Sequence, residues 1–271
     1  MTILIDYLQY PFFVRALVVG GIIGLILSWM SGYVVMRREV VLTHALSHLG
    51  FLGIAFAILF SLPITLSLVG ACLIGIYLIH LVRNEKLFYS DSLLEIFAQL
   101  SLALAIVVIS FFPGYRINIE QFLFGDILGI SKADLWMSLV LLVLVGGIIV
   151  FFHRTFLKIS LSDVLSHTLV RYKKFWNALL LIILALMIAL AIRVVGVLLV
   201  AAFVTIPSNT AKLVTKSITA SFICSSLIGV VSTFTGLFIS AFWDIPTGAM
   251  IVLVMGVLWF FSIFWKRVKR I

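Results

Sequence analysis

The stretch WNALLLIILALMIALAIRVVGVLLVAAFVTIPSNTA, residues 176–211, decides the topology of this chain. Arg193 is its only charged residue. A helix needs about 20 apolar residues to cross the hydrocarbon core of a bilayer. The stretch could therefore be one long helix or two spans that pivot near Arg193. The choice between them decides on which side of the membrane the neighbouring basic loops lie.

The composition of the whole chain places it in a membrane. Of its 271 residues, 64% are apolar and 11% are charged, whereas soluble domains have about 45–50% and about 25%. A soluble fold of this size could not bury so much apolar surface. The composition therefore excludes a soluble enzyme, a nucleic-acid-binding protein and a disordered chain. The formal net charge of +9 comes from short basic clusters between apolar runs, which are typical of topology-setting charges.

Apolar segments recur along the chain, and we expect an all-α, polytopic membrane helix bundle with about eight or nine spans. The candidate spans lie near residues 12–36, 41–60, 64–82, 92–112, 134–152, 176–192, 195–211, 218–240 and 247–265. No composition shift divides the chain, so residues 1–271 are expected to form a single integral membrane domain.

The basic residues favour nine spans. If the basic tail at 266–270 is cytoplasmic, nine spans place most of the 19 Lys and Arg residues on the cytoplasmic side. A single span over 176–211 would instead put Lys212 and Lys216 on the opposite side from the basic group at 171–174. The excess of positive charge in cytoplasmic loops therefore predicts an external N-terminus and a cytoplasmic C-terminus.

The most distinctive local motif is the histidine pair in THALSH, residues 43–48. Positions i and i+4 share one face of a helix, so the side chains of His44 and His48 can point at one spot. Both lie in the cytoplasmic third of the second span, where polar groups usually face a bundle interior or a pore. The pair could bind a divalent transition metal ion, or it could hydrogen-bond to neighbouring helices. A homodimer with this helix at its axis could present four imidazoles.

The sequence lacks the motifs of an enzyme. It has no G-x-x-x-x-G-K-[ST] motif and does not bind nucleotide phosphates in that way itself. The residues between His44 and His48 lack the glutamate of the H-E-x-x-H zinc-protease motif. We therefore expect no catalytic residues and no permanently bound cofactor, and any metal ion would be transported cargo.

Two further segments interrupt the regular helix pattern. The stretch at about 113–136 is too apolar for a solvated loop and too short to cross, which predicts a re-entrant extracellular segment. Its Asp126 could be a ligand or gate carboxylate, or a helix cap. Pro207 predicts a broken helix, and small polar residues such as Asn209 could satisfy the freed backbone groups. Together with Arg193, these two residues are candidates for a gate.

Five short motifs occur in an order that resembles the permease subunits of ABC importers for zinc, manganese or iron. They are ALSH at 45–48, FGDIL at 124–128 with DLW at 134–136, RVVGVLLV at 193–200, IPSNTA at 206–211 and DIPTGA at 244–249. Each motif alone is weak, but all five in this order, on a matching topology, are specific. The matching pieces run from about residue 20 to 256.

The resemblance implies a multi-pass permease in the cytoplasmic (inner) membrane of a prokaryote. Two copies, embedded in membrane lipids, would pair around a central path, with His44 and His48 handling zinc, manganese or iron. A separate cytoplasmic ABC ATPase dimer would hydrolyse ATP, and an extracytoplasmic metal-binding protein would deliver the metal. No nucleic acid is involved.

The resemblance also implies that a cytoplasmic insert, at about 153–175, couples the permease to the ATPase. The expected contacts are Ser162, Asp163, Leu165 and His167. This insert is atypical, because residues 162–169 contain no glycine to end the coupling helix.

The chain departs from the family pattern at His44, where such permeases usually carry an aspartate. An imidazole in place of a carboxylate favours zinc or iron over manganese. Two alternatives remain: a permease for a metal chelate or siderophore, and a self-sufficient secondary metal carrier. Such carriers usually contain inverted repeats or buried acidic relays, neither of which is evident, and Glu95 lies near a membrane end.

Overall fold

The computed structural model describes residues 9–83, 90–111, 125, 132–161 and 172–268. In these parts the chain is helical. The helices are α2 (Pro11–Met36), α3 (Val40–Leu59), α4 (Ile64–Arg83), α5 (Ser90–Ser110), α7 (Lys132–Phe151), α8 (His153–Leu161), α10 (Lys173–Val195), α11 (Val197–Val214), α12 (Ile218–Trp243) and α13 (Thr247–Val268).

The span count agrees with the sequence prediction. Seven of the described helices are long and apolar enough to cross a membrane, and the bent pair α7 and α8 would make an eighth. The apolar part of α4, Ile64–Ile79, is shorter. The all-α membrane bundle of about eight or nine spans is confirmed, and each of the nine predicted segments coincides with a helix.

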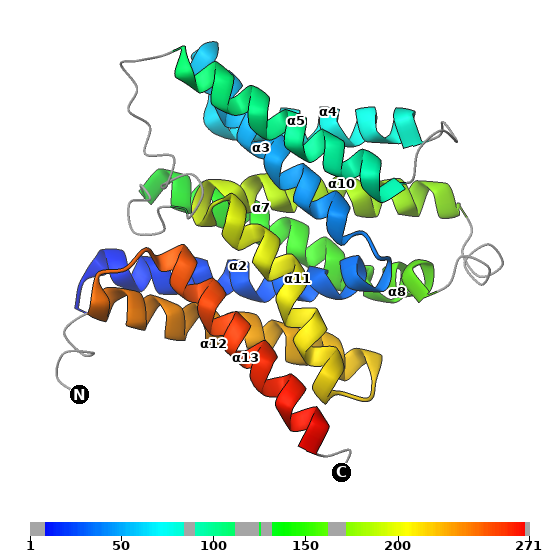
Figure 1. The fold of residues 1–271 in the computed structure, drawn as a ribbon, viewed down its shortest axis with the longest axis vertical. Coiled ribbons are helices and arrows are strands. Elements are labelled where there is room, and N and C mark those ends of the chain that lie inside the picture. Colours follow the sequence, from blue (N-terminus) through cyan, green and yellow to red (C-terminus); the bar gives the residue numbers. More distant parts are fainter. Residues whose placement is uncertain (1–8, 84–89, 112–124, 126–131, 162–171, 269–271) are drawn as a thin grey trace.

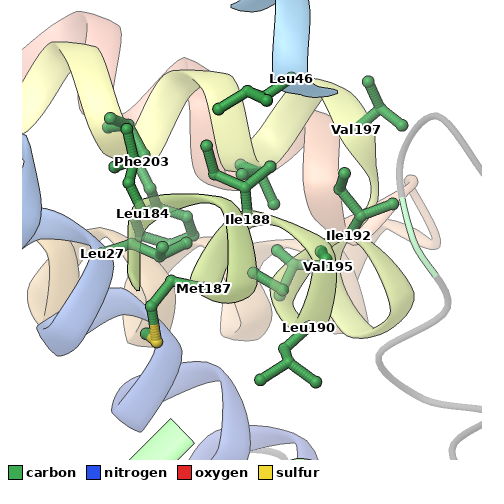
Figure 2. Close-up of a cluster of buried hydrophobic side chains, with 14 of the residues drawn as sticks. Leu27, Leu46, Leu184, Met187, Ile188, Leu190, Ile192, Val195, Val197 and Phe203 are labelled. Atoms are coloured by element: carbon green, nitrogen blue, oxygen red, sulfur yellow. The ribbon is translucent and has the colours of Figure 1, made fainter. Parts of the chain in front are cut away.

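The helices form two groups joined by α10 and α11. Figure 1 shows α3, α4 and α5 together at one end of the molecule and α2, α12 and α13 at the other. Helix α10 packs on α3 and α4, and α11 packs on α2, α12 and α13. Figure 2 shows the buried apolar core between them, to which α10 contributes most of the labelled side chains. These include Leu184, Ile188 and Ile192, together with Leu46 of α3 and Phe203 of α11.

The stretch at 176–211 forms two helices that meet at Gly196. This glycine has φ 84° and ψ 163°, a conformation that other residues rarely adopt, and its N–H still donates to the carbonyl of Ile192 at 2.9 Å. The expected pivot near Arg193 is therefore confirmed, three residues further along the chain. Gly125, with φ 75°, packs against this break, because a Cβ at Gly125 would lie 2.3 Å from the carbonyl carbon of Val195. The rest of the predicted re-entrant segment, with Asp126, lies outside the described residues.

The prediction that Pro207 breaks its helix was wrong. Helix α11 continues through Pro207 to Val214. Hydroxyl and amide side chains bond to backbone carbonyls in the same turns: Thr205 to Ala201 at 2.8 Å and Asn209 to Thr205 at 2.9 Å. Membrane helices tolerate proline when such side chains and neighbouring helices compensate for the lost backbone bond.

Small residues let α2 and α12 approach closely. A Cβ at Gly229 would lie 2.5 Å from the carbonyl oxygen of Gly24 and 2.0 Å from the hydroxyl of Ser28. One turn away, the hydroxyls of Ser31 and Ser225 lie 3.1 Å apart. These contacts join two helices that are distant in sequence.

The helix ends predicted to be cytoplasmic gather on one side of the molecule. The C-terminal end of α2, helix α8 and the N-terminal end of α12 all lie on the right in Figure 1. Helix α8 follows α7 with a bend of 66° and forms the first part of the insert at about 153–175. The predicted coupling residues Ser162, Asp163, Leu165 and His167 lie outside the described residues.

Candidate metal site

The histidine pair on α3 is the centre of the candidate site. His44 and His48 lie one turn apart, and their rings meet edge to face with centroids 4.5 Å apart. The two Nε2 atoms face each other at 3.1 Å. The spacing of the two residues along the helix therefore brings both imidazoles to one spot, as predicted.

The separation of these two nitrogen atoms suits the binding of one metal ion by both rings. Zinc binds imidazole nitrogen at about 2.0–2.1 Å, so two nitrogens on one tetrahedral ion lie about 3.3 Å apart. The Nε2 atoms of His44 and His48 are within a few tenths of an ångström of that distance. Without an ion, the same contact is a hydrogen bond in which one ring donates to the other.

Helix α5 adds a carboxylate that the sequence analysis did not assign to the site. Oε2 of Glu95 lies 3.8 Å from Nδ1 of His44, the ring nitrogen that faces away from His48. Its other oxygen accepts a hydrogen bond from Nε2 of Gln99 at 2.9 Å. A carboxylate beside the second nitrogen of a metal-binding histidine helps to orient the ring. The sequence did contain a signal for Glu95, because it is an acidic residue in an apolar stretch, four positions before Gln99.

The site is partly open and is incomplete within the described residues. The side chains of His44 and Glu95 are 44% and 49% exposed. Nδ1 of His48 is buried without a hydrogen-bond partner. Over the described ranges, no group of three or more His, Cys, Asp or Glu side chains is placed to hold a metal ion. The pair could therefore hold an ion only with further ligands, such as water or a second copy of the chain.

The candidate gate residues have contacts elsewhere. Arg193, near the end of α10, donates a hydrogen bond to the hydroxyl of Thr65 on α4. Asn209 bonds to its own helix at Thr205, and Pro207 is buried inside α11. Each of these three assignments as a gate stays a prediction, as does the role of Asp126 as a ligand or gate.

Replacing Glu95 by glutamine is expected to weaken zinc binding by the purified chain about tenfold, because the neutral amide no longer places a negative charge beside the ring of His44. Isothermal titration calorimetry with zinc in detergent measures the effect. Asp91→Asn is the matched control, since Asp91 is an acidic residue one turn earlier on α5 with no described partner. Equal affinity of Glu95→Gln and the parent would contradict the role given to Glu95.

Comparison with known proteins links the chain to one family and one fold. The model of the ABC 3 transport family matches residues 9–266. Among solved structures, PsaBC from Streptococcus pneumoniae in complex with Fab has a TM-score of 0.84 at 24% identity. That match covers 95% of this chain and 93% of the other. The structural likeness shows a shared fold.

Two curated relatives match over nearly the whole chain. The manganese transport system membrane protein MntC of Listeria monocytogenes is 26% identical over 265 residues, which cover 97% of this chain and 93% of that protein. The high-affinity zinc uptake system membrane protein ZnuB of Haemophilus influenzae is 28% identical over 250 residues. Here the coverage is 92% of this chain and 95% of that protein.

Proposed function

Because the chain belongs to the ABC 3 transport family, we propose that it is the permease subunit of an ATP-binding cassette importer for a divalent transition metal ion. The cargo is zinc, manganese or iron, and the membrane is the cytoplasmic membrane of a prokaryote. The observation that carries the metal assignment is the pair of Nε2 atoms 3.1 Å apart on α3, with Glu95 behind His44. The manganese and zinc systems named for its relatives support it.

The histidine pair acts as a transient binding point for the ion. Two imidazoles and water hold a divalent ion less firmly than the four protein ligands of a structural zinc site. Incomplete coordination therefore suits a site that must also release its ion. The Glu95 carboxylate keeps Nε2 of His44 directed at the ion by its position beside Nδ1.

The exposure of this site supports the pairing of two copies of the chain at this face. Glu95 is half-exposed near the start of the mainly apolar helix α5. Charged groups within a membrane are costly in lipid and usually face a water-filled cavity or another protein surface. We propose that this face of α3 and α5 borders the transport path between two permease copies.

The remaining partners are assigned from the family. The ABC ATPase dimer docks on the side where α8 and the basic helix ends lie, and it hydrolyses the ATP, because the permease is not itself catalytic. Ser162, Asp163, Leu165 and His167 are the proposed coupling contacts. An extracytoplasmic binding protein delivers the ion on the opposite side, where Gly125 packs against the break at Gly196.

The imidazole of His44 favours zinc or iron as the cargo. The reverse change, His44→Asp, restores a harder oxygen ligand and is expected to shift the uptake preference severalfold toward manganese. Competition between labelled zinc and labelled manganese in the same transport assay measures this ratio. An unchanged ratio would show that His44 does not set the metal preference.

Reconstitution into liposomes tests the function. The permease, its ATPase and its binding protein together are expected to accumulate labelled zinc, manganese or iron only with ATP. The permease alone is the control and is expected to transport none. Uptake by the permease alone without ATP would instead indicate a secondary carrier, and ATP-dependent uptake of a metal–siderophore complex alone would indicate the chelate alternative.

A further inference from the structure

A second site lies apart from the histidine pair, where α2, α11 and α12 meet. The pocket there has a volume of about 170 Å³ and is lined by residues near the C-terminal ends of α2 and α11, in the connection between α11 and α12, and near the start of α12. These are ends that the basic residues predict to be cytoplasmic. Its walls are apolar at Met36 and Phe222 and polar at Ser208.

Ser208 contributes a buried hydroxyl to the lining of this pocket. Its side chain is completely buried, yet its hydroxyl has no hydrogen-bond partner. On the same helix, the hydroxyls of Thr205 and Thr210 donate to carbonyls one turn earlier. A buried hydroxyl without a partner is destabilising, by about 1–3 kcal/mol. A ligand that accepts a hydrogen bond from Ser208 would remove this penalty.

The charges around the pocket favour a negatively charged ligand. Lys212 and Lys216 line it, and neither forms an ion pair or a hydrogen bond with any residue of the described chain. No lining residue is acidic, and Glu39, three residues after Met36 in the chain, is paired with Arg37 at 3.0 Å. The pocket thus combines two ammonium groups with a free hydroxyl.

The start of α12 adds to this preference. Ser217 caps the helix by accepting a hydrogen bond from the backbone N–H of Ala220 at 3.2 Å. The N-terminus of a helix carries a partial positive charge and exposes unpaired backbone N–H groups, which favour anions. Phosphate oxygens satisfy lysine ammonium groups, hydroxyls and backbone N–H groups together.

We propose that this pocket binds a phosphate group at the cytoplasmic face of the protein, contributed by an anionic phospholipid head group or by soluble phosphate. Lys212 and Lys216 supply the charge, and Ser208 donates a hydrogen bond at the base of the pocket. Basic pockets between membrane helices on the cytoplasmic side are suited to anionic head groups. The pocket involves neither α3 nor α5, so the proposal does not depend on the metal site.

Binding to the purified full-length chain in detergent tests the proposal. The probes are phosphatidylglycerol, phosphatidylcholine as the zwitterionic comparison, and inorganic phosphate. Native mass spectrometry and the thermal shift measure binding. Phosphatidylglycerol is expected to bind the parent more tightly than phosphatidylcholine, and Lys212→Gln with Lys216→Gln is expected to weaken that binding more than tenfold. Stabilisation by inorganic phosphate at equal or lower concentration would identify the soluble source.

Ser208→Ala separates a built site from general attraction to basic residues. It removes a hydrogen bond and is expected to weaken binding about fivefold, while the unliganded Tm stays at least as high as that of the parent. Lys266→Gln with Arg267→Gln removes two charges from the end of α13 and is the control expected to bind normally. Equal losses in this control, or unchanged binding by Ser208→Ala, would overturn the proposal.

Discussion

Replacing His48 by alanine is expected to lower ATP-dependent metal uptake by the complete transporter about 100-fold. The change removes one of two imidazoles whose Nε2 atoms lie 3.1 Å apart. Loss of a group that only orients a metal ligand typically costs about 10–100-fold in affinity or activity, so the loss of a ligand is expected to reach the upper end. Initial rates of labelled zinc or iron uptake into proteoliposomes measure the effect.

The control for this prediction lies next to His48 on α3. Ser47 is buried and donates a hydrogen bond to the carbonyl of Thr43 in its own helix, away from the histidine pair. Ser47→Ala is therefore expected to keep uptake near that of the parent. Normal uptake by His48→Ala, with the protein folded and the ATPase bound, would show that the pair has a packing role only.

Replacing Gly229 by alanine is expected to lower the free energy of unfolding by about 1–3 kcal/mol. The new methyl group would lie 2.5 Å from the carbonyl oxygen of Gly24 and 2.0 Å from the hydroxyl of Ser28. The serine side chain can rotate, but the carbonyl belongs to the backbone of α2, so the two helices must move apart. Thermal unfolding of the purified chain in detergent measures the loss.

Gly256→Ala is the matched control, because it makes the same chemical change in another membrane helix. No atom lies within 4 Å of the position that a Cβ at Gly256 would occupy. The greater helix propensity of alanine is expected to leave the stability unchanged or raise it by up to about 1 kcal/mol. If both variants were equally stable, close contact between α2 and α12 would not contribute to the stability of the bundle.

Features that depend on local periodicity could be predicted from the sequence. Apolar length and the distribution of basic residues predicted the nine segments and the division of the stretch at 176–211, because each helix must satisfy its own backbone in lipid. The i, i+4 spacing likewise predicted that His44 and His48 share one face. The resemblance carried by five ordered motifs led to the correct family.

Features that depend on contacts between distant segments were decided by the tertiary structure. Glu95 belongs to the site only because α5 packs on α3, and α11 continues through Pro207 although proline removes a backbone hydrogen bond from the helix. The pocket around Ser208 exists only where α2, α11 and α12 meet. Hydropathy describes how each helix interacts with lipid, but it contains no information about which helices become neighbours. That choice depends on side-chain packing between surfaces far apart in the chain, such as the approach of Gly24 to Gly229.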